Sequence, residues 1–126
     1  MGDLEYGLIL QQKWEDLAKY IFPTVLRSMP KSERFSLGAD IRGLIWEVEE
    51  ILIQLSLKRG TNGFRLQLLQ TVDIKAKTLM AMIRLGIQLD VIPQERYKTV
   101  SARLVEIGKI VGGLMKSLQQ GTVRSR

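Results

Sequence analysis

Carboxylates are the first side chains in this sequence whose spacing suggests chemistry. Glu47, Glu49 and Glu50 stand close together, and Asp40 precedes Glu47 by one heptad. Carboxylates at this spacing on a helix could hold a divalent cation. Carboxylate metal sites in helical bundles, however, pair Glu with His, and the chain contains no His and no Cys. We therefore interpret the cluster as a solvated acidic surface and predict no metal, no cofactor and no enzymatic activity.

Charge is divided unevenly between the two halves of the chain. Residues 1–57 carry 6 Lys/Arg and 9 Asp/Glu, a net charge of −3, whereas residues 58–126 carry 13 and 4, a net charge of +9. Such an excess suggests an acidic partner, and the phosphate backbone of RNA or DNA is the usual one. The alternative is a basic surface that serves only solubility. Because Phe64 and Tyr97 are the only aromatic residues of the second half, sequence-specific reading of single strands by stacking is not predicted.

The basic side chains of the second half form stripes at helical spacing. At 100° per residue, Lys98, Lys109 and Lys116 project within about 20° of one another. Arg96 and Arg103 form a second line on the other flank of the apolar seam. The full set of predicted contacts to nucleic acid or a partner is Lys58, Arg59, Arg65, Lys77, Arg84, Arg96, Lys98, Arg103, Lys109 and Lys116.

Four amphipathic helices must position these side chains. Apolar residues recur at intervals of three and four in four segments, which is the pattern of one helix face. We predict helices over residues 4–28, from Ser32 or Ser36 to Lys58, over residues 64–89 and over residues 93–118. The strongest seam is in the last helix and consists of Tyr97, Val100, Leu104, Ile107, Val111, Leu114 and Leu118.

Proline and glycine residues mark the breaks between these helices. Pro23 lies inside the first segment and should kink it, because proline removes one backbone hydrogen bond. Gly60 and Gly63 end the second helix, and Pro93 starts the fourth. Short connectors make neighbouring helices antiparallel, so we predict an all-α, antiparallel up-down-up-down four-helix bundle. The bundle should form a single domain over residues 1–118, followed by a flexible basic tail over residues 119–126.

The start of the sequence does not resemble a targeting signal. Met1–Glu5 is acidic where a signal peptide is basic, and no apolar run is long enough to span a bilayer. We therefore expect a cytoplasmic protein that does not insert into membranes.

More apolar residues are present than one core needs. The second and third helices carry additional apolar residues beside their seams, such as Trp46, Ile53 and Leu85. We expect these residues to support self-association, although a wide core face is the alternative. Gly108 and Gly112 lie on one face of the fourth helix, which favours close packing either within the bundle or against another subunit.

Several segments of the chain resemble a known family. Lys19–Pro23, Met29–Lys31 and Arg34–Leu37 are similar to the first helix and turn of the accessory variability determinant proteins, which accompany diversity-generating retroelements. Ile92–Tyr97 and Glu106–Lys116 resemble their fourth helix. The resemblance covers about residues 10 to 118. The wider family includes four-helix-bundle proteins encoded by intervening sequences of ribosomal RNA genes, and a generic protein of that type is the alternative reading.

The resemblance implies more than the periodicity does. It implies a homopentamer with a basic surface that binds a reverse transcriptase and its template RNA or cDNA. It also implies a non-catalytic role in mutagenic retrohoming, the adenine-mutagenic copying that diversifies a target gene. Leu114 stands where relatives often have Trp after the glycine pair.

Overall fold

The computed structural model describes the backbone of residues 3–124 and the side chains of residues 8–120. Four long helices and two short helical segments make up this part of the chain, which contains no strand. In chain order they are α1 (Asp3–Ile21), the π-helical turn η1 (Phe22–Leu26), α2 (Lys31–Arg34), α3 (Leu37–Ser56), α4 (Asn62–Gln88) and α5 (Glu95–Arg124).

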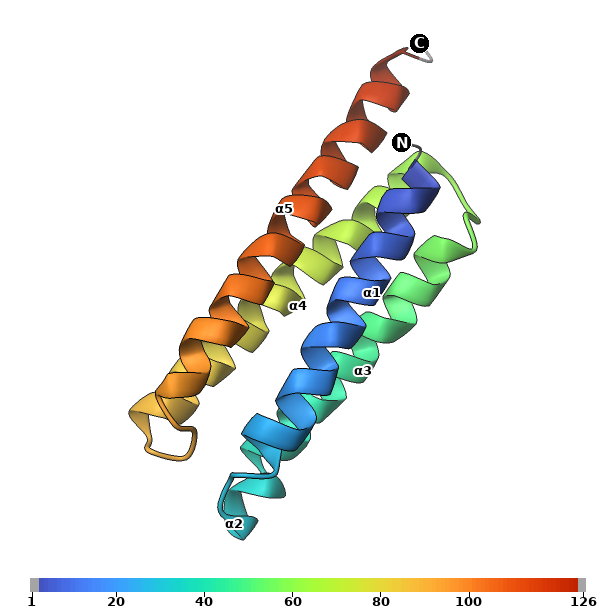
Figure 1. Cartoon of the computed structure of the whole chain (residues 1–126). Coiled ribbons are helices and arrows are strands. Elements are labelled where there is room, and N and C mark those ends of the chain that lie inside the picture. The colour runs from blue at the N-terminus through green and yellow to red at the C-terminus, as the bar shows by residue number, and fades with distance from the viewer. Residues whose placement is uncertain (1–2, 125–126) are drawn as a thin grey trace.

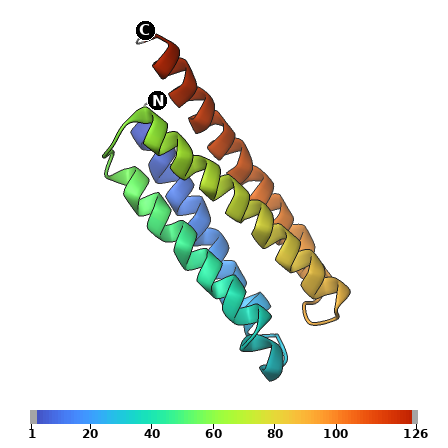
Figure 2. The same cartoon turned by 180° about the vertical axis from the view of Figure 1, so that it is seen from behind.

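The four long helices form an antiparallel up-down-up-down bundle (Figure 1). In cross-section they lie at the corners of a square, because α1 packs against α3 and α5, and α4 packs against the same two helices. The view from behind shows α3 beside α4 along their length (Figure 2). The predicted fold class is therefore confirmed.

The core consists of the residues that the spacing pattern selected. Val100, Leu104 and Ile107 of α5 are almost completely buried, as are the predicted seam residues of α1 and α4. In α3 the middle of the seam is buried, whereas Leu37, Ile51 and Leu55 are only partly buried. Trp14 is 1% exposed, and its indole Nε1 donates a hydrogen bond of 3.1 Å to the carbonyl oxygen of Ile45. Burying an aromatic side chain of this size contributes about 2–3 kcal/mol to folding, and the hydrogen bond fixes the height of α1 against α3.

One predicted member of the α5 seam lies outside the core. Tyr97 is 37% exposed, whereas the neighbouring Ile92, from the connector before α5, is buried. The side chain of Ile92 approaches α4 closely, because a Cβ placed on Gly86 would lie 2.4 Å from its Cδ1. The connector therefore closes this end of the core in place of Tyr97.

Pro23 changes the helix type instead of only kinking it. Proline has no backbone N–H to donate, and the chain passes through the π-helical turn Phe22–Leu26, where the N–H of Arg27 donates to the carbonyl oxygen of Phe22. Beyond it, the predicted second helix divides into α2 and α3. The break between them leaves Phe35 and Ser36 outside both helices.

The remaining helix ends depart from the prediction by only a few residues, except at the C-terminus. Gly60 adopts the left-handed conformation, with φ of +86°, in the reversal between α3 and α4, where glycine has no steric penalty. At the end of the chain, α5 continues past the predicted boundary at Leu118 as far as Arg124. Residues 125 and 126 of the predicted tail lie outside the described residues.

Candidate nucleic-acid interface

Five of the predicted basic residues lie on one outer face, between α4 and α5. We call Lys77, Arg84, Lys98, Lys109 and Lys116 the α4/α5 face. Lys77 lines a groove between the two helices, and Arg84, one heptad later, projects about 20° away from it. The three lysines of α5 follow the edge of this groove, because each projects within about 40° of Val105, another groove residue.

The groove beneath these cations is mostly apolar. Its volume is about 200 Å³, and its floor includes Met80, Leu104 and Val105. Asp73 is the acidic residue among its lining residues, and its Oδ2 lies 2.7 Å from Nζ of Lys77. The Lys77 side chain still exposes 76% of its surface. Lysines and arginines beside an apolar floor can reach phosphates while their stems stay packed.

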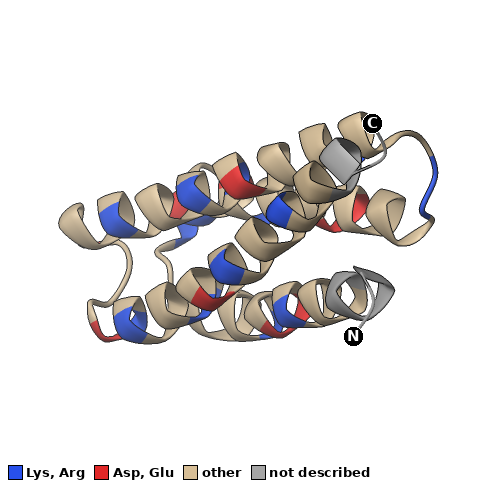
Figure 3. Cartoon of the chain, turned by 90° about the horizontal axis from the view of Figure 1, so that it is seen from above, with Lys and Arg blue, Asp and Glu red and all other residues tan. Residues whose placement is uncertain are grey.

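Most of this positive charge is not neutralised within the chain. Arg84 and the three lysines of α5 are exposed, and among residues 8–120 none of them forms an ion pair. Lys and Arg are spread along the length of the helices rather than gathered at one end (Figure 3). The five cations of the α4/α5 face therefore present a line of charge parallel to the bundle axis.

The glycines of α5 lie beside this line and face open space. A Cβ placed on Gly108, Gly112 or Gly113 would meet nothing within 4 Å. The alternative of close packing within the bundle is therefore wrong for this chain. Gly108 itself lines the groove. Glycine in a helix costs about 1 kcal/mol relative to alanine, and packing within the bundle does not account for that cost at these three positions.

Arg96 and Arg103 lie on the opposite side of α5, which faces α1. Burial alone would raise the pKa of Tyr20, but hydrogen bonds to Thr99 and Arg96, and the charge of Arg96, lower that pKa below its ordinary value of 10.0. Nε of Arg96 is buried and has no hydrogen-bond partner. Arg96 is therefore mainly a contact between α5 and α1.

Arg103 lies in a mixed-charge environment on the same side. Nζ of Lys13 lies 2.8 Å from Oε1 of Glu106. This hydrogen bond and the charge of Lys13 lower the pKa of the Glu106 carboxyl, and Arg103 and Lys109 add to the effect. The charge of Glu106 is thus shared by Lys13, Arg103 and Lys109, and Arg96 differs from the lysines of α5 through its contact with Tyr20.

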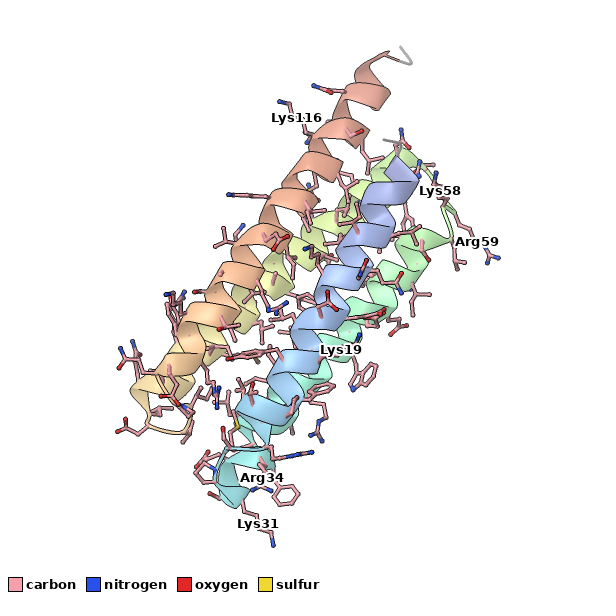
Figure 4. The ribbon with its side chains drawn as sticks, in the orientation of Figure 1. Lys19, Lys31, Arg34, Lys58, Arg59 and Lys116 are labelled. Carbon is pink, nitrogen blue, oxygen red and sulfur yellow. The ribbon has the colours of Figure 1, made fainter. Side chains whose placement is uncertain are left out.

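The basic residues between α3 and α4 lie at one end of the bundle. Lys58 and Arg59 are exposed there, at the end opposite Lys31 and Arg34 (Figure 4). Arg65 is half-buried, and its Nη2 donates to Oδ1 of Asn62. Lys58 and Arg65 border an apolar pocket of about 50 Å³ that opens between all four long helices. These three residues do not join the α4/α5 face.

The acidic cluster does not converge on a single point. Oε2 of Glu47 accepts a hydrogen bond of 2.6 Å from Lys75 of α4, whereas Oε1 of Glu49 accepts one of 3.2 Å from Nε2 of Gln11 in α1. Burial, together with the hydrogen bond and charge of Glu15, raises the pKa of Glu49 to about 7, although the bond from Gln11 opposes the shift. Within the described residues, no group of three or more acidic side chains is arranged to hold a metal.

Sequence reasoning missed the exposure of Phe35 and counted Trp46 only among the surplus apolar residues of the second helix. Phe35 is 76% exposed and Trp46 is 58% exposed. Only the aromatics of residues 58–126 had been weighed, because the basic charge is concentrated there. Phe35 lies in the break between α2 and α3, so helical period could not have predicted its exposure.

The bundle fold and the basic α4/α5 face define an all-α protein with a candidate polyanion-binding surface. The family model described as bAvd-like matches residues 8–118. The chain therefore belongs to the bAvd-like family of Avd-type accessory proteins, as its resemblance predicted. No curated protein and no solved structure gives a significant match. None of the described helices is both long and apolar enough to cross a bilayer.

Proposed function

We propose that this protein is a non-catalytic accessory factor of a diversity-generating retroelement. In this proposal it binds the reverse transcriptase and the template RNA or cDNA in the cytoplasm and supports mutagenic retrohoming. The family membership supports the retroelement setting. A reverse-transcriptase gene with paired variable and template repeats is expected beside the coding sequence.

The observation that carries the nucleic-acid role is the α4/α5 face. Lys77 lines a groove with one acidic neighbour, and Gly108 and Gly112 leave the backbone of α5 open beside it. By helical position the other four cations project on the same side of the bundle. Phosphates attract such a line of charge, and each neutralised phosphate releases counterions. The groove supplies no stack of exposed aromatic rings, so binding follows the backbone and does not depend on base sequence.

Self-association is part of the same proposal. Ile74, Leu85 and Leu89 of the α4 region are between 54% and 68% exposed, and apolar side chains left this open are typical of surfaces that contact another chain. The family resemblance implies five copies. Sedimentation of the purified protein tests this number, and a monomer at tens of micromolar would contradict it.

The nucleic-acid role is tested with two variants of equal charge. The face variant replaces Arg84, Lys98 and Lys109 with Ala, and the control variant replaces Arg27, Lys31 and Arg34, which are exposed elsewhere. Each variant loses three positive charges, so the non-specific attraction between the protein and RNA falls equally in both. Fluorescence anisotropy with labelled single-stranded RNA should show at least about a tenfold weaker affinity for the face variant, or about 1.4 kcal/mol.

The control variant should bind nearly as well as the parent. Circular dichroism should show unchanged helicity in both variants, because exposed substitutions cost little stability. If the control variant loses as much affinity as the face variant, binding reports only net charge and the proposed interface is wrong.

A further inference from the structure

The α3 helix carries a second apolar seam that faces outward. Phe35, just before α3, and Trp46, Ile53 and Leu57 are each between 46% and 76% exposed. We call these four residues the outer seam. From Trp46 to Leu57 they follow intervals of seven and four residues, the repeat by which one helix packs against another. The buried seam of α3, with Ile41, Leu44 and Val48, lies on a different side of the same helix.

The outer seam lies on the side of α3 that borders α1. The rings of Trp46 and Phe22 are 6.2 Å apart, and the Arg42 guanidinium lies 5.7 Å from the centre of the Phe22 ring. Phe22 directly follows α1. The seam therefore belongs to a surface formed by α1 and α3, away from the α4/α5 face.

Charge on this surface is ordered along the seam, with Trp46 between the two signs. Arg42 precedes Trp46 by four residues, and Glu50 follows it by four. Lys19 of α1 lies toward the Arg42 end, because α1 runs antiparallel to α3 and Trp14 bonds the carbonyl of Ile45. Glu49 is half-buried against Gln11 of α1, so Glu50 carries the outward acidic charge. Around Trp46 the surface is thus basic on one side and acidic on the other, and the cations Lys58 and Arg59 follow Leu57 at the end of α3.

A surface with this order is complementary to itself when turned end over end. We propose that the α1/α3 surface binds the same surface of a second copy of this chain, with α3 antiparallel to its counterpart and Trp46 at the two-fold axis. Arg42 of each copy then lies level with Glu50 of the other. Phe35, eleven residues before Trp46, lies level with Leu57, eleven residues after it. Such isologous contacts are the commonest in homo-oligomers.

The contact extends the self-association in the proposed function and leaves the α4/α5 face open for nucleic acid. A two-fold contact pairs copies and cannot by itself close a ring of five. A five-membered ring would use other exposed apolar residues, such as Ile74 and Leu85 of α4. The α3 contact would then join two rings. In either case, loss of this contact halves the mass of the assembly.

Crosslinking tests the position of the axis directly, because the chain has no cysteine of its own. Trp46→Cys places one thiol at the proposed axis, and Ala102→Cys places one at an exposed site on α5 that has no part in the proposed contacts between copies. Under mild oxidation at low protein concentration, Trp46→Cys should form a covalent dimer at least about tenfold faster than Ala102→Cys. Equal rates for the two variants would overturn the proposal.

Charge reversal tests the antiparallel order without relying on the tryptophan. One variant carries Arg42→Glu, and the other carries Glu50→Lys. Each alone should sediment at half the mass of the parent assembly, because like charges then face each other. An equimolar mixture should recover the parent mass, because each acidic end meets a basic one.

The outcomes separate this proposal from the nucleic-acid role. If both variants keep the parent mass, or if mixing restores nothing, the two-fold contact is wrong. Sedimentation without nucleic acid measures only the mass of the assembly. Anisotropy of the face variant measures only RNA binding by the α4/α5 face. Circular dichroism of each charge-reversal variant shows whether the bundle has folded. If one of these variants does not fold, the crosslinking rate of Trp46→Cys still tests the two-fold contact.

Discussion

The helix pairs α1/α3 and α4/α5 bury similar cores but have contrasting outer surfaces. The α1/α3 surface combines exposed aromatic residues such as Trp46 with a coupled pair of acids, Glu15 and Glu49. The α4/α5 face combines five cations with an apolar groove and open glycine backbone. Because the buried seams of the two helix pairs are alike, the core does not indicate which side of the bundle binds which kind of partner. We propose that the α1/α3 side contacts protein and that the α4/α5 side contacts a polyanion.

The largest expected effect is a loss of stability on replacing Trp14, which lies in the core, compared with Trp46, which lies on the α1/α3 surface. Trp14→Ala should lower the free energy of unfolding by about 3–5 kcal/mol, because it leaves a buried cavity and removes the hydrogen bond from the indole to the carbonyl oxygen of Ile45. Trp46→Ala should change it by about 0.5 kcal/mol or less in the dissociated chain. Urea denaturation at low protein concentration measures both, and equal losses would contradict this assignment of core and surface.

The acidic pair makes the stability of the α1/α3 contact depend on pH. The folded chain holds the Glu49 proton up to about pH 7, whereas the ordinary pKa is 4.5. The folded state therefore binds more protons between these values, and stability falls as pH rises through this window. Because Glu49 is partly exposed, the loss should be only about 1 kcal/mol.

Substitution of Glu49 tests this directly. Glu49→Gln should remove most of the loss between pH 5 and pH 8 and should make the chain more stable than the parent at pH 8. Glu50→Gln, at the exposed neighbouring position, should keep the parent pH dependence. Urea midpoints across this range give the comparison, and a parent whose midpoint rises with pH would refute the account of the pair.

Much of the fold was predictable from the sequence, because burial follows helical period. Val100, Leu104 and Ile107 recur at intervals of three and four and are all buried. The type of turn at Pro23 was not predictable, because a missing N–H permits either a kink or a π-helical turn. Tyr97 has the right period, yet Ile92 from the connector covers that end of the core.

The site was predictable only in part. Period showed that Lys98 and Arg96 project from different sides of their helix, but not which neighbouring helix each side faces. That assignment depends on the arrangement of all four helices, which puts Lys77 beside the lysines of α5 and puts Arg96 against Tyr20. The arrangement of the four helices also leaves open space around Gly112, which the sequence alone did not predict.

The smallest predicted effect comes from replacing one glycine of α5 and one glycine of α3. The two replacements should change stability equally, so a difference in RNA binding reports only on which helix the RNA approaches. Gly112 of α5 and Gly43 of α3 are both inside helices, and a Cβ on either would meet nothing within 4 Å. Replacement by Ala should stabilise the chain by about 0.5–1 kcal/mol in both cases. Only Gly112→Ala should weaken RNA binding, measured by anisotropy. Equal binding by the two variants would show that close approach to α5 is not needed.

The salt dependence of RNA binding tests the central claim most directly. Anisotropy titrations from 50 to 200 mM salt should give the parent a steep negative slope of log affinity against log salt. The face variant should have a slope shallower by about 2, because each lost phosphate contact on a single strand removes about 0.7. The control variant should keep the parent slope. A parent with no salt dependence, or a face variant with the parent slope, would contradict the assignment of the α4/α5 face to nucleic acid.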